Sequence, residues 1–234
     1  MTDTPSTSRS TANRPAHGRA YRGVSIEQRR AERREKLIQA GINVFGSTGF
    51  QGTTVRALCA EAGLTERYFY ESFSNSEALL CNIYVRLTDQ IRDKVSGAIS
   101  RQQGEPDAMA DAALTAYFEF LHDNPGAARI IMTEIIGVSP EVDALYRKVM
   151  NDFAAFLLVV FRGLHPERSP HAVQDTLIAT GMIGALVNMA MRWLLNDFKE
   201  SVTDMVAAAH FILIAVNNQL LRTKPSLIRD RSPS

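Results

Sequence analysis

The chain has 234 residues, which is long enough for one large domain or two modest ones. Hydrophobic residues make up 45% of it and charged residues 22%, so the composition excludes a disordered chain and suits a packed core. The net charge of +1 conceals an asymmetry, because residues 1–75 hold 11 Lys and Arg against 7 Asp and Glu, and residues 76–234 hold 15 against 18. A basic N-terminal part suits contact with nucleic-acid phosphates.

Export, membrane insertion and disulfide bonding are all disfavoured by the sequence. Residues 1–20 are polar, lack the apolar run of a signal peptide, and are predicted to be a disordered basic arm. The uncharged stretches 176–191 and 205–221 are shorter than the ~20 residues of a membrane-spanning helix, so we expect buried helices and no membrane. Cys59 and Cys81 lie in apolar helical patterns, and we expect small core residues in a reducing cytoplasm.

Everything beyond the arm has helical periodicity, and no segment alternates at period two for long enough to predict a strand. The first helix is expected over 25–46, where several arginines precede an apolar face, and some of these arginines are expected to contact phosphate. A capping box at Ser74–Glu77 starts a long helix that runs to about residue 100. Turn residues and Asn-Pro or Ser-Pro pairs then predict helices ending near 123 and spanning about 125–137, 140–164, 170–196 and 202–222.

Residues 53–80 carry the most specific pattern of the chain. Val55 and Leu58 give a first short helix its apolar face, and Gly63 supplies a tight turn. Thr65 is expected to be the N-cap of a second short helix, in which Phe69 points to the core together with Leu64 and Phe73. Two short helices joined in this way are typical of a helix-turn-helix, which lays its second helix in the major groove of DNA.

These residues resemble the N-terminal signature of the tetracycline-repressor (TetR) family of bacterial transcription regulators. The shared positions are Phe45, Gly49, Phe50, Thr53–Val55, Leu58, Ala62–Thr65, Phe69, Tyr70, Phe73, Asn75 and Glu77–Leu80. Two positions depart from it: Cys59 stands where the family usually has Ala, and Ser76 where it often has a phosphate-binding Lys.

The resemblance implies an all-α fold of about nine helices. A helix-turn-helix DNA-binding domain with three helices is expected over 21–75, after the arm at 1–20. A larger ligand-binding and dimerisation domain with six helices is expected over 76–224, followed by a tail at 225–234.

Four residues are predicted to position the protein on the DNA backbone and the adjacent minor groove. Thr53 and Thr54 start the helix-turn-helix, where hydroxyls and free N–H groups meet phosphate. Tyr70 is expected to bring its phenol to the backbone without reading sequence. Arg22 is expected to enter the minor groove, as basic arms do.

Base readout is predicted on the first turn and a half of the second short helix, at Thr65, Glu66, Arg67 and Tyr68. Arg67 is the natural guanine reader, through a bidentate contact to O6 and N7. Glu66 is expected either to accept a hydrogen bond from cytosine or to orient the Arg67 side chain.

The body is predicted to bind a small-molecule effector, of which an apolar compound is the mildly favoured kind. Family resemblance favours a pocket between the helices, and methionines adapt to varied ligand shapes. Plain core packing is the alternative for each candidate residue. The candidates lie on apolar faces of different helices: Phe118, Met132, Ile136, Met150, Phe153 and Met182.

The last two long helices are predicted to form a dimer interface. A monomer burying both apolar faces by itself is the alternative, and the family resemblance favours a four-helix bundle with a second copy. The candidate interface residues are Gly181, Ala185, Met189, Trp193, Ala209, Ile212 and Val216.

Catalysis finds little support, because the sequence has no phosphate loop, dinucleotide fingerprint or serine nucleophile elbow. The histidines show no metal-binding spacing, so no metal or cofactor is predicted. We therefore expect a homodimeric, cytoplasmic repressor that binds a palindromic double-stranded DNA operator and is released by its effector. The alternatives are an activator or a protein-controlled regulator of the same fold and, less favoured, an enzyme on a helical scaffold.

Overall fold

The computed structural model describes residues 25–102, 105–167 and 172–222. The predicted arm, Arg22, the tail at 225–234 and the predicted helix start near residue 170 lie outside these ranges. Within them the regular structure is helical, as predicted: α1 (Ile26–Thr48), α2 (Val55–Ala62), α3 (Glu66–Ser72), α4 (Ser76–Ser100), α5 (Pro106–Asp123), α6 (Pro125–Arg129), the π-helix η1 (Ile130–Glu134), α7 (Pro140–Leu164), α8 (Ala172–Leu195) and α9 (Val202–Arg222).

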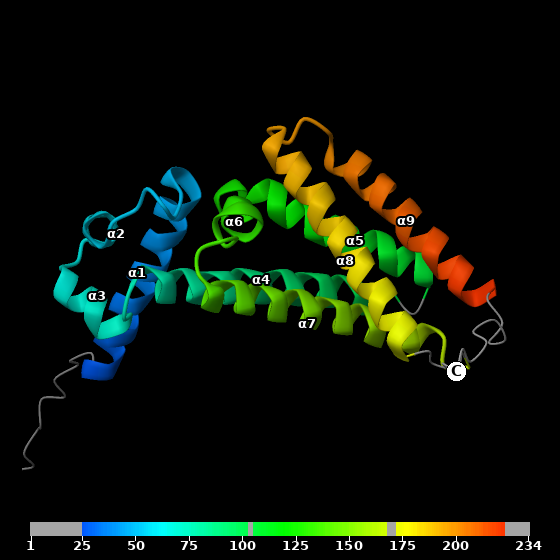
Figure 1. Cartoon of the computed structure of the whole chain (residues 1–234), viewed down its shortest axis with the longest axis horizontal. Coiled ribbons are helices and arrows are strands. Elements are labelled where there is room, and N and C mark those ends of the chain that lie inside the picture. The colour runs from blue at the N-terminus through cyan, green and yellow to red at the C-terminus, as the bar shows by residue number, and fades with distance from the viewer. Residues whose placement is uncertain (1–24, 103–104, 168–171, 223–234) are drawn as a thin grey trace, which may run out of the picture.

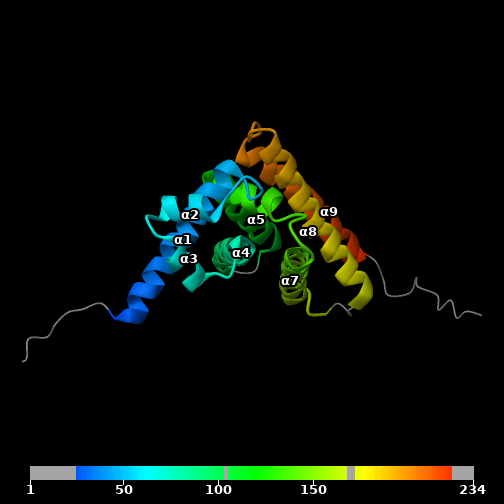
Figure 2. The same cartoon turned by 60° about the vertical axis from the view of Figure 1, so that its left-hand side comes forward.

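The helices form a head and a body joined by one long helix (Figure 1). Helices α1, α2 and α3 make up the head, and α4 runs from the head along the length of the body with α7 beside it. Helix α5 packs between α4 and α9, and α8 packs on α7. The turned view shows α8 and α9 as a sloping pair on the outside of the body (Figure 2).

Helix starts are fixed by side-chain caps of the kind that the sequence predicts. The side chains of Ser25, Thr54 and Ser139 each accept a hydrogen bond from the backbone N–H three residues later. For α4 the cap is Asn75, one residue after the predicted Ser74, and its Oδ1 accepts from Ala78 N at 2.8 Å.

One hydrophobic core runs through both parts of the molecule. In the head, Leu37 and Phe45 of α1 meet Leu58 of α2 and Phe69 of α3, and all four are fully buried. Leu80 and its neighbours on α4 continue this core into the body. Burying each such side chain contributes about 1.5–3 kcal/mol, so the head is bound firmly to the start of α4.

The two cysteines are core residues, as predicted. Both are free thiols; Cys59 is buried in the head and Cys81 is half-buried on α4. Burial raises the pKa of both thiols. A thiol with a raised pKa is a poor nucleophile, which fits a packing role.

The structure corrects the predicted regular helix over 125–137. Helix α6 ends at Arg129 and continues as one π-helical turn, which takes up more residues per turn than an α-helix. The change of register turns Ile135 inward, where it is fully buried, and leaves Ile136 48% exposed. Ile136 therefore lies at the surface and does not line the cavity of the body, contrary to the expected apolar face of a regular helix.

Two further predictions are corrected by an aromatic cluster that closes the α8–α9 turn. Trp193 is fully buried, packs edge-on against Phe118 with ring centroids 5.7 Å apart, and donates its indole N–H to the carbonyl of Glu200 at 2.9 Å. Phe118 is thus a core residue and not a ligand contact. Because Trp193 and Ala209 are both fully buried within the monomer, neither is available to a second copy.

The remaining surfaces of α8 and α9 are strongly apolar. Leu177 is 67% exposed and Phe211 is 76% exposed, and a Cβ on Gly181 or Gly184 would meet no atom within 4 Å apart from its chain neighbours and the backbone of its own helix. By length and composition alone both helices could cross a membrane, and only 17% of each apolar window is buried within the chain. Helices at a subunit interface have the same composition, so this is weak evidence for a membrane.

Candidate DNA interface and ligand cavity

Helices α2 and α3 form the helix-turn-helix that the sequence predicts. The turn passes through Gly63, whose φ of 63° lies in the left-handed region that glycine tolerates. Thr54 caps α2 by accepting from Ala57 N at 3.2 Å, and Thr53 donates its hydroxyl to Gly49 O at 2.6 Å. Thr53 and Thr54 thus shape the start of the motif; their contact with phosphate stays a prediction.

The predicted DNA-reading residues of α3 differ in solvent exposure and in their hydrogen bonds. Thr65 and Glu66 are exposed; Thr65 is the N-cap residue of α3, as predicted, but its hydroxyl makes no capping bond. The Arg67 side chain is 84% exposed, and its Nε donates to Glu71 Oε1 at 3.2 Å. The Arg67 side chain is therefore oriented by Glu71, one turn further along α3, and not by Glu66.

The two tyrosines of α3 differ in setting. Tyr70 is 57% exposed, as a backbone-contacting phenol requires. Tyr68 is half-buried, with the guanidinium of Arg33 4.4 Å from its ring centroid. Tyr68 is held against α1, and its predicted contact with bases is untested.

The arginines of α1 support the recognition helix. Arg30 donates to the backbone carbonyl of Glu71 at 2.9 Å, and Arg33 lies 3.8 Å from the Glu71 carboxylate. The guanidinium of Arg34 covers the ring of Phe73 at 4.9 Å. Sequence reasoning assigned such arginines to phosphate and missed Glu71, because an acidic residue on a DNA-reading helix gives no local sign of a partner on another helix.

A polar joint connects the head to the body where α1 ends. Glu134 of η1 accepts the backbone N–H of Phe50 at 2.7 Å through Oε2 and the Nε of Arg129 at 2.8 Å through Oε1. Arg129 also donates to the carbonyl of Ser47 at 2.8 Å. Backbones meet closely beside it, since a Cβ on Gly46 would lie 2.7 Å from Gly126 Cα. The joint satisfies two backbone groups that the end of α1 leaves free.

A second contact ties the middle of α1 to α4. Arg86 Nη1 lies 2.6 Å from Glu35 Oε2, and both side chains are partly exposed. This hydrogen bond lowers the pKa of Glu35. The head is thus fixed to the body by polar contacts at two points.

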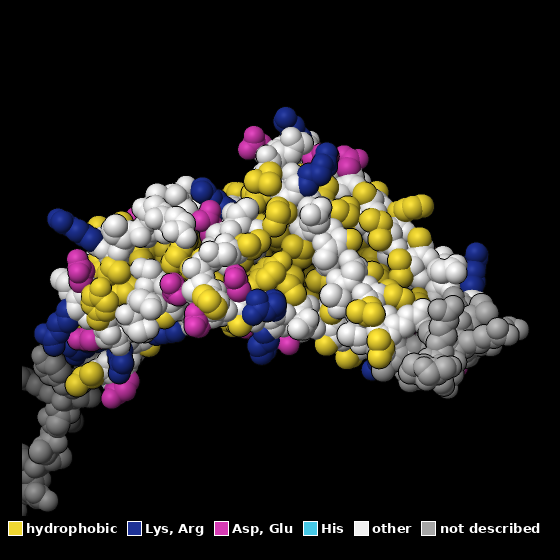
Figure 3. All heavy atoms as spheres, in the orientation of Figure 1, with side chains coloured by type: hydrophobic (Ala, Val, Ile, Leu, Met, Phe, Trp, Pro, Cys, Tyr) yellow, Lys and Arg dark blue, Asp and Glu magenta, His cyan; other side chains and the backbone are white. Residues whose placement is uncertain are grey.

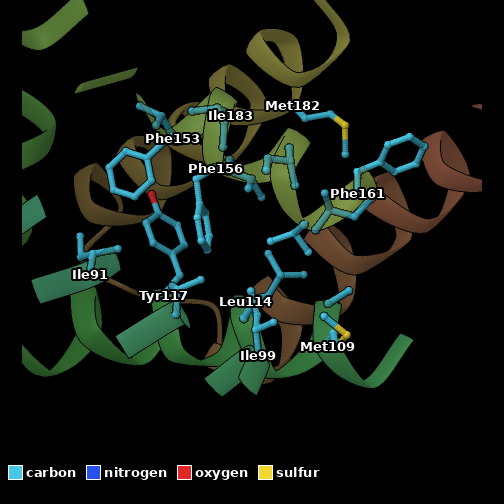
Figure 4. Close-up of a pocket in the computed structure, with 18 of the residues that line it drawn as sticks. Ile91, Ile99, Met109, Leu114, Tyr117, Phe153, Phe156, Phe161, Met182 and Ile183 are labelled. Carbon is cyan, nitrogen blue, oxygen red and sulfur yellow. The ribbon is translucent and has the colours of Figure 1, made fainter. Parts of the chain in front are cut away.

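The body contains an apolar cavity of roughly 200 Å³, which is partly open to solvent (Figure 4). Of the predicted ligand residues, Met132, Met150, Phe153 and Met182 line it, and Phe118 and Ile136 do not. That the four residues bind a ligand stays a prediction. Hydrophobic side chains also gather on the surface over this part of the body (Figure 3).

The cavity is elongated along α4, a feature that sequence reasoning missed. Thr88, Ile91, Val95 and Ile99 line it in one stripe, which spans about 16 Å at 1.5 Å per residue. Thr88 and Ile91 are buried and Val95 and Ile99 are partly exposed, so the inner end lies toward the head. The three-to-four-residue spacing of this stripe is visible in the sequence, but residues packed in a helical core have the same spacing, so the spacing alone does not indicate a cavity.

Polar groups reach the cavity at few points. Asn217 lines it and lies 2.9 Å from His165 Nε2, whereas Tyr117 contributes a phenol from α5 (Figure 4). All 26 lining residues are uncharged. In the described parts of the chain no cluster of His, Cys, Asp and Glu is placed to hold a metal ion.

An all-α protein whose head is a helix-turn-helix belongs to the class of DNA-binding regulators. Residues 37–82 match the family model described as "Bacterial regulatory proteins, tetR family". The head of the chain thus matches the helix-turn-helix region of this family of transcription regulators, as the sequence resemblance implies.

Relatives extend the likeness beyond the head. The chain is 26% identical over 183 residues to the HTH-type transcriptional regulator YerO of Bacillus subtilis, covering 75% of this chain and 62% of YerO. It is 28% identical over 184 residues to the HTH-type transcriptional activator FasR of Mycolicibacterium smegmatis, covering 79% of this chain and 81% of FasR. The match therefore spans less than two thirds of YerO.

Solved structures share the fold. The transcriptional regulator FadR of Bacillus subtilis, solved in complex with stearoyl-CoA, aligns with a TM-score of 0.68 at 16% identity, over 77% of this chain and 97% of FadR. The fatty acid degradation regulator FadR of Bacillus halodurans aligns with a TM-score of 0.66 at 18% identity, over 82% of this chain and 97% of that chain.

Proposed function

We propose that the protein is a homodimeric, cytoplasmic repressor that binds a palindromic operator and is released by an elongated, apolar small molecule. The head supplies the DNA-reading helix α3, with Arg67 and Tyr70 exposed on it. The elongated apolar cavity supports the ligand class, as does the stearoyl-CoA bound by FadR of Bacillus subtilis.

The observation that carries this proposal is the position of η1 between the cavity and the head. Ile131 and Met132 of this single turn line the cavity, whereas Arg129 and Glu134 at its ends hold Ser47 and Phe50 of the head. A ligand that moves Ile131 or Met132 therefore acts on residues only two or three positions from the joint. Helix α4, which lines the cavity and enters the head core, offers a second connection.

Homodimer formation is supported by the apolar surface that α8 and α9 leave uncovered. A second copy packed on Leu177, Gly181 and Gly184 would find no side chain blocking close helix approach. Among the predicted interface residues, Gly181 and Ile212 are exposed. The others that are not fully buried are half-buried: Ala185, Met189 and Val216. Two copies would place two heads on one DNA duplex, which suits a palindromic site.

An activator of the same fold is the second candidate, favoured by the likeness to the activator FasR. Geometry of the head and cavity is the same for both roles. A reporter fused to the bound promoter separates them, because deleting the gene of a repressor raises reporter output and deleting that of an activator lowers it.

The direct experiment is footprinting on DNA from upstream of the protein's own gene. We expect protection of two inverted half-sites separated by a whole number of helical turns, about 34 Å each. Saturation of one asymmetric half-site by a monomer would contradict the proposal.

A further inference from the structure

Two buried phenol oxygens of the body have no hydrogen-bond partner among the described residues, those of Tyr84 and Tyr117. Only Tyr117 lines the ligand cavity. In Figure 4 its oxygen lies beside Phe153, among the apolar side chains of the inner end. Thr88, the other hydroxyl-bearing residue of the lining, donates its hydroxyl to the carbonyls of Tyr84 and Val85.

An unpartnered hydroxyl in an apolar site is unfavourable, so a phenol of this kind at a ligand cavity points to a partner supplied by the ligand. Phenylalanine would fill the same volume without this cost. Burial, and then the neighbouring phenols of Tyr146 and Tyr84, raises the pKa of Tyr117. The group therefore stays protonated at neutral pH and offers an O–H donor.

The rest of the lining limits what the ligand can place there. Because all of the lining residues are uncharged, an ionised ligand group at the inner end would lie buried without a counter-charge. An uncharged oxygen, in contrast, can accept the hydrogen bond from Tyr117 at little cost. A charged group of the same ligand would remain at the open end, near Ile99 and Asn217.

We propose that Tyr117 is a specificity-determining residue that selects an elongated apolar ligand carrying an uncharged hydrogen-bond acceptor, such as a hydroxyl, ketone or ester oxygen, at its innermost end. This inference rests on the proposed ligand-binding function of the cavity. It distinguishes the ligand from a plain acyl chain, whose terminal methyl would leave the phenol of Tyr117 without a partner.

A matched pair of probes tests this: dodecanoic acid and ω-hydroxydodecanoic acid. The carboxylate keeps both at the open end, so the two differ only at the atom that meets Tyr117. Acids of about ten to sixteen carbons bracket the ~16 Å stripe of α4. The affinity of each acid is measured by calorimetry for the native protein and for Tyr117→Phe.

We expect the preference for the hydroxylated acid to fall on the order of tenfold in Tyr117→Phe, because its hydroxyl then lies buried without a donor. Tyr84→Phe is the matched control, since that phenol is equally buried and unpartnered but does not line the cavity. The control should keep the native preference. Unliganded Tyr117→Phe should unfold at or above the native temperature, because no hydrogen bond is lost.

The outcomes separate this inference from the proposed function. If both acids bind but their ratio is the same in the native protein and in Tyr117→Phe, the role of Tyr117 is overturned and the cavity remains a ligand site. A marked loss of thermal stability in Tyr117→Phe would show a structural bond and would overturn it as well. If no acid of either series binds either protein, the proposed ligand class itself fails.

Discussion

Glu134 accepts the backbone N–H of Phe50 at 2.7 Å, across the boundary between the body and the head. The two residues are distant in sequence, and their contact places a carboxylate of the π-turn on the loop that leads into the helix-turn-helix. The same turn lines the cavity, so η1 contacts both the cavity and the head.

Glu134→Ala should destabilise the protein by about 1–3 kcal/mol, because it leaves the half-buried N–H of Phe50 and the guanidinium of Arg129 without this partner. Operator affinity should fall with it, since α2 and α3 follow directly. Urea unfolding and DNA titration measure the two effects. Glu134→Gln, which keeps an acceptor, should cost less, and Glu141→Ala on the exposed start of α7 serves as the control.

Arg67→Ala and Tyr70→Phe should weaken DNA binding in different ways. Arg67→Ala should cost roughly 1–3 kcal/mol and relax the preference at one base position, because a guanine contact is lost. Tyr70→Phe should weaken binding to all sequences alike, because a phosphate contact carries no sequence information. Selection of binding sites from random DNA distinguishes the two; an unchanged motif for Arg67→Ala would remove this residue from base readout.

Leu177→Glu should convert the proposed dimer to a monomer, because it places a charge in the apolar surface of α8. Val159→Glu on α7 is the matched control: Val159 is 68% exposed, close to the 67% of Leu177, but lies outside α8 and α9. Light scattering after size-exclusion chromatography gives the mass of each variant. A dimer that survives Leu177→Glu and dissociates with Val159→Glu would place the interface elsewhere.

The contact between Glu35 and Arg86 should stabilise the protein only above acidic pH. Its hydrogen bond lowers the pKa of folded Glu35, so its contribution is complete above the unfolded value of about 4.3 and is lost as pH falls through the lower folded value. Because both side chains are partly exposed, the pair contributes under ~1 kcal/mol to the free energy of unfolding. Glu35→Gln should therefore unfold in less urea than the native protein at pH 7 and match it in strong acid. The control Glu32→Gln, on the exposed side of the same helix, should unfold at the same urea concentration as the native protein both at pH 7 and in strong acid.

The head could be predicted almost residue by residue because its signals are local. The turn at Gly63, the cap at Thr54 and the apolar spacing of Leu58 and Phe69 each act within a few residues. Support for α3 by Arg33 could not be predicted, since the contact joins separate helices and arginine runs are equally typical of a solvated face.

The body was harder to predict, because its helices are apolar on more than one face. Periodicity does not say whether Trp193 packs on Phe118 within the monomer or on a second copy. For the helix expected over 125–137 the error came from the π-turn, whose change of register has no clear signal in the sequence. The polar joint was missed because Glu134 and Phe50 meet only in the folded chain.

We propose that ligand occupancy of the cavity and binding of DNA are coupled through the joint at η1. Calorimetry of ω-hydroxydodecanoic acid with the free protein and with the protein saturated by its operator tests this most directly. We predict that operator DNA weakens binding of the acid by about 5–150-fold, the same factor by which the acid weakens DNA binding. Equal affinity of the acid for the free and the DNA-bound protein would contradict the account.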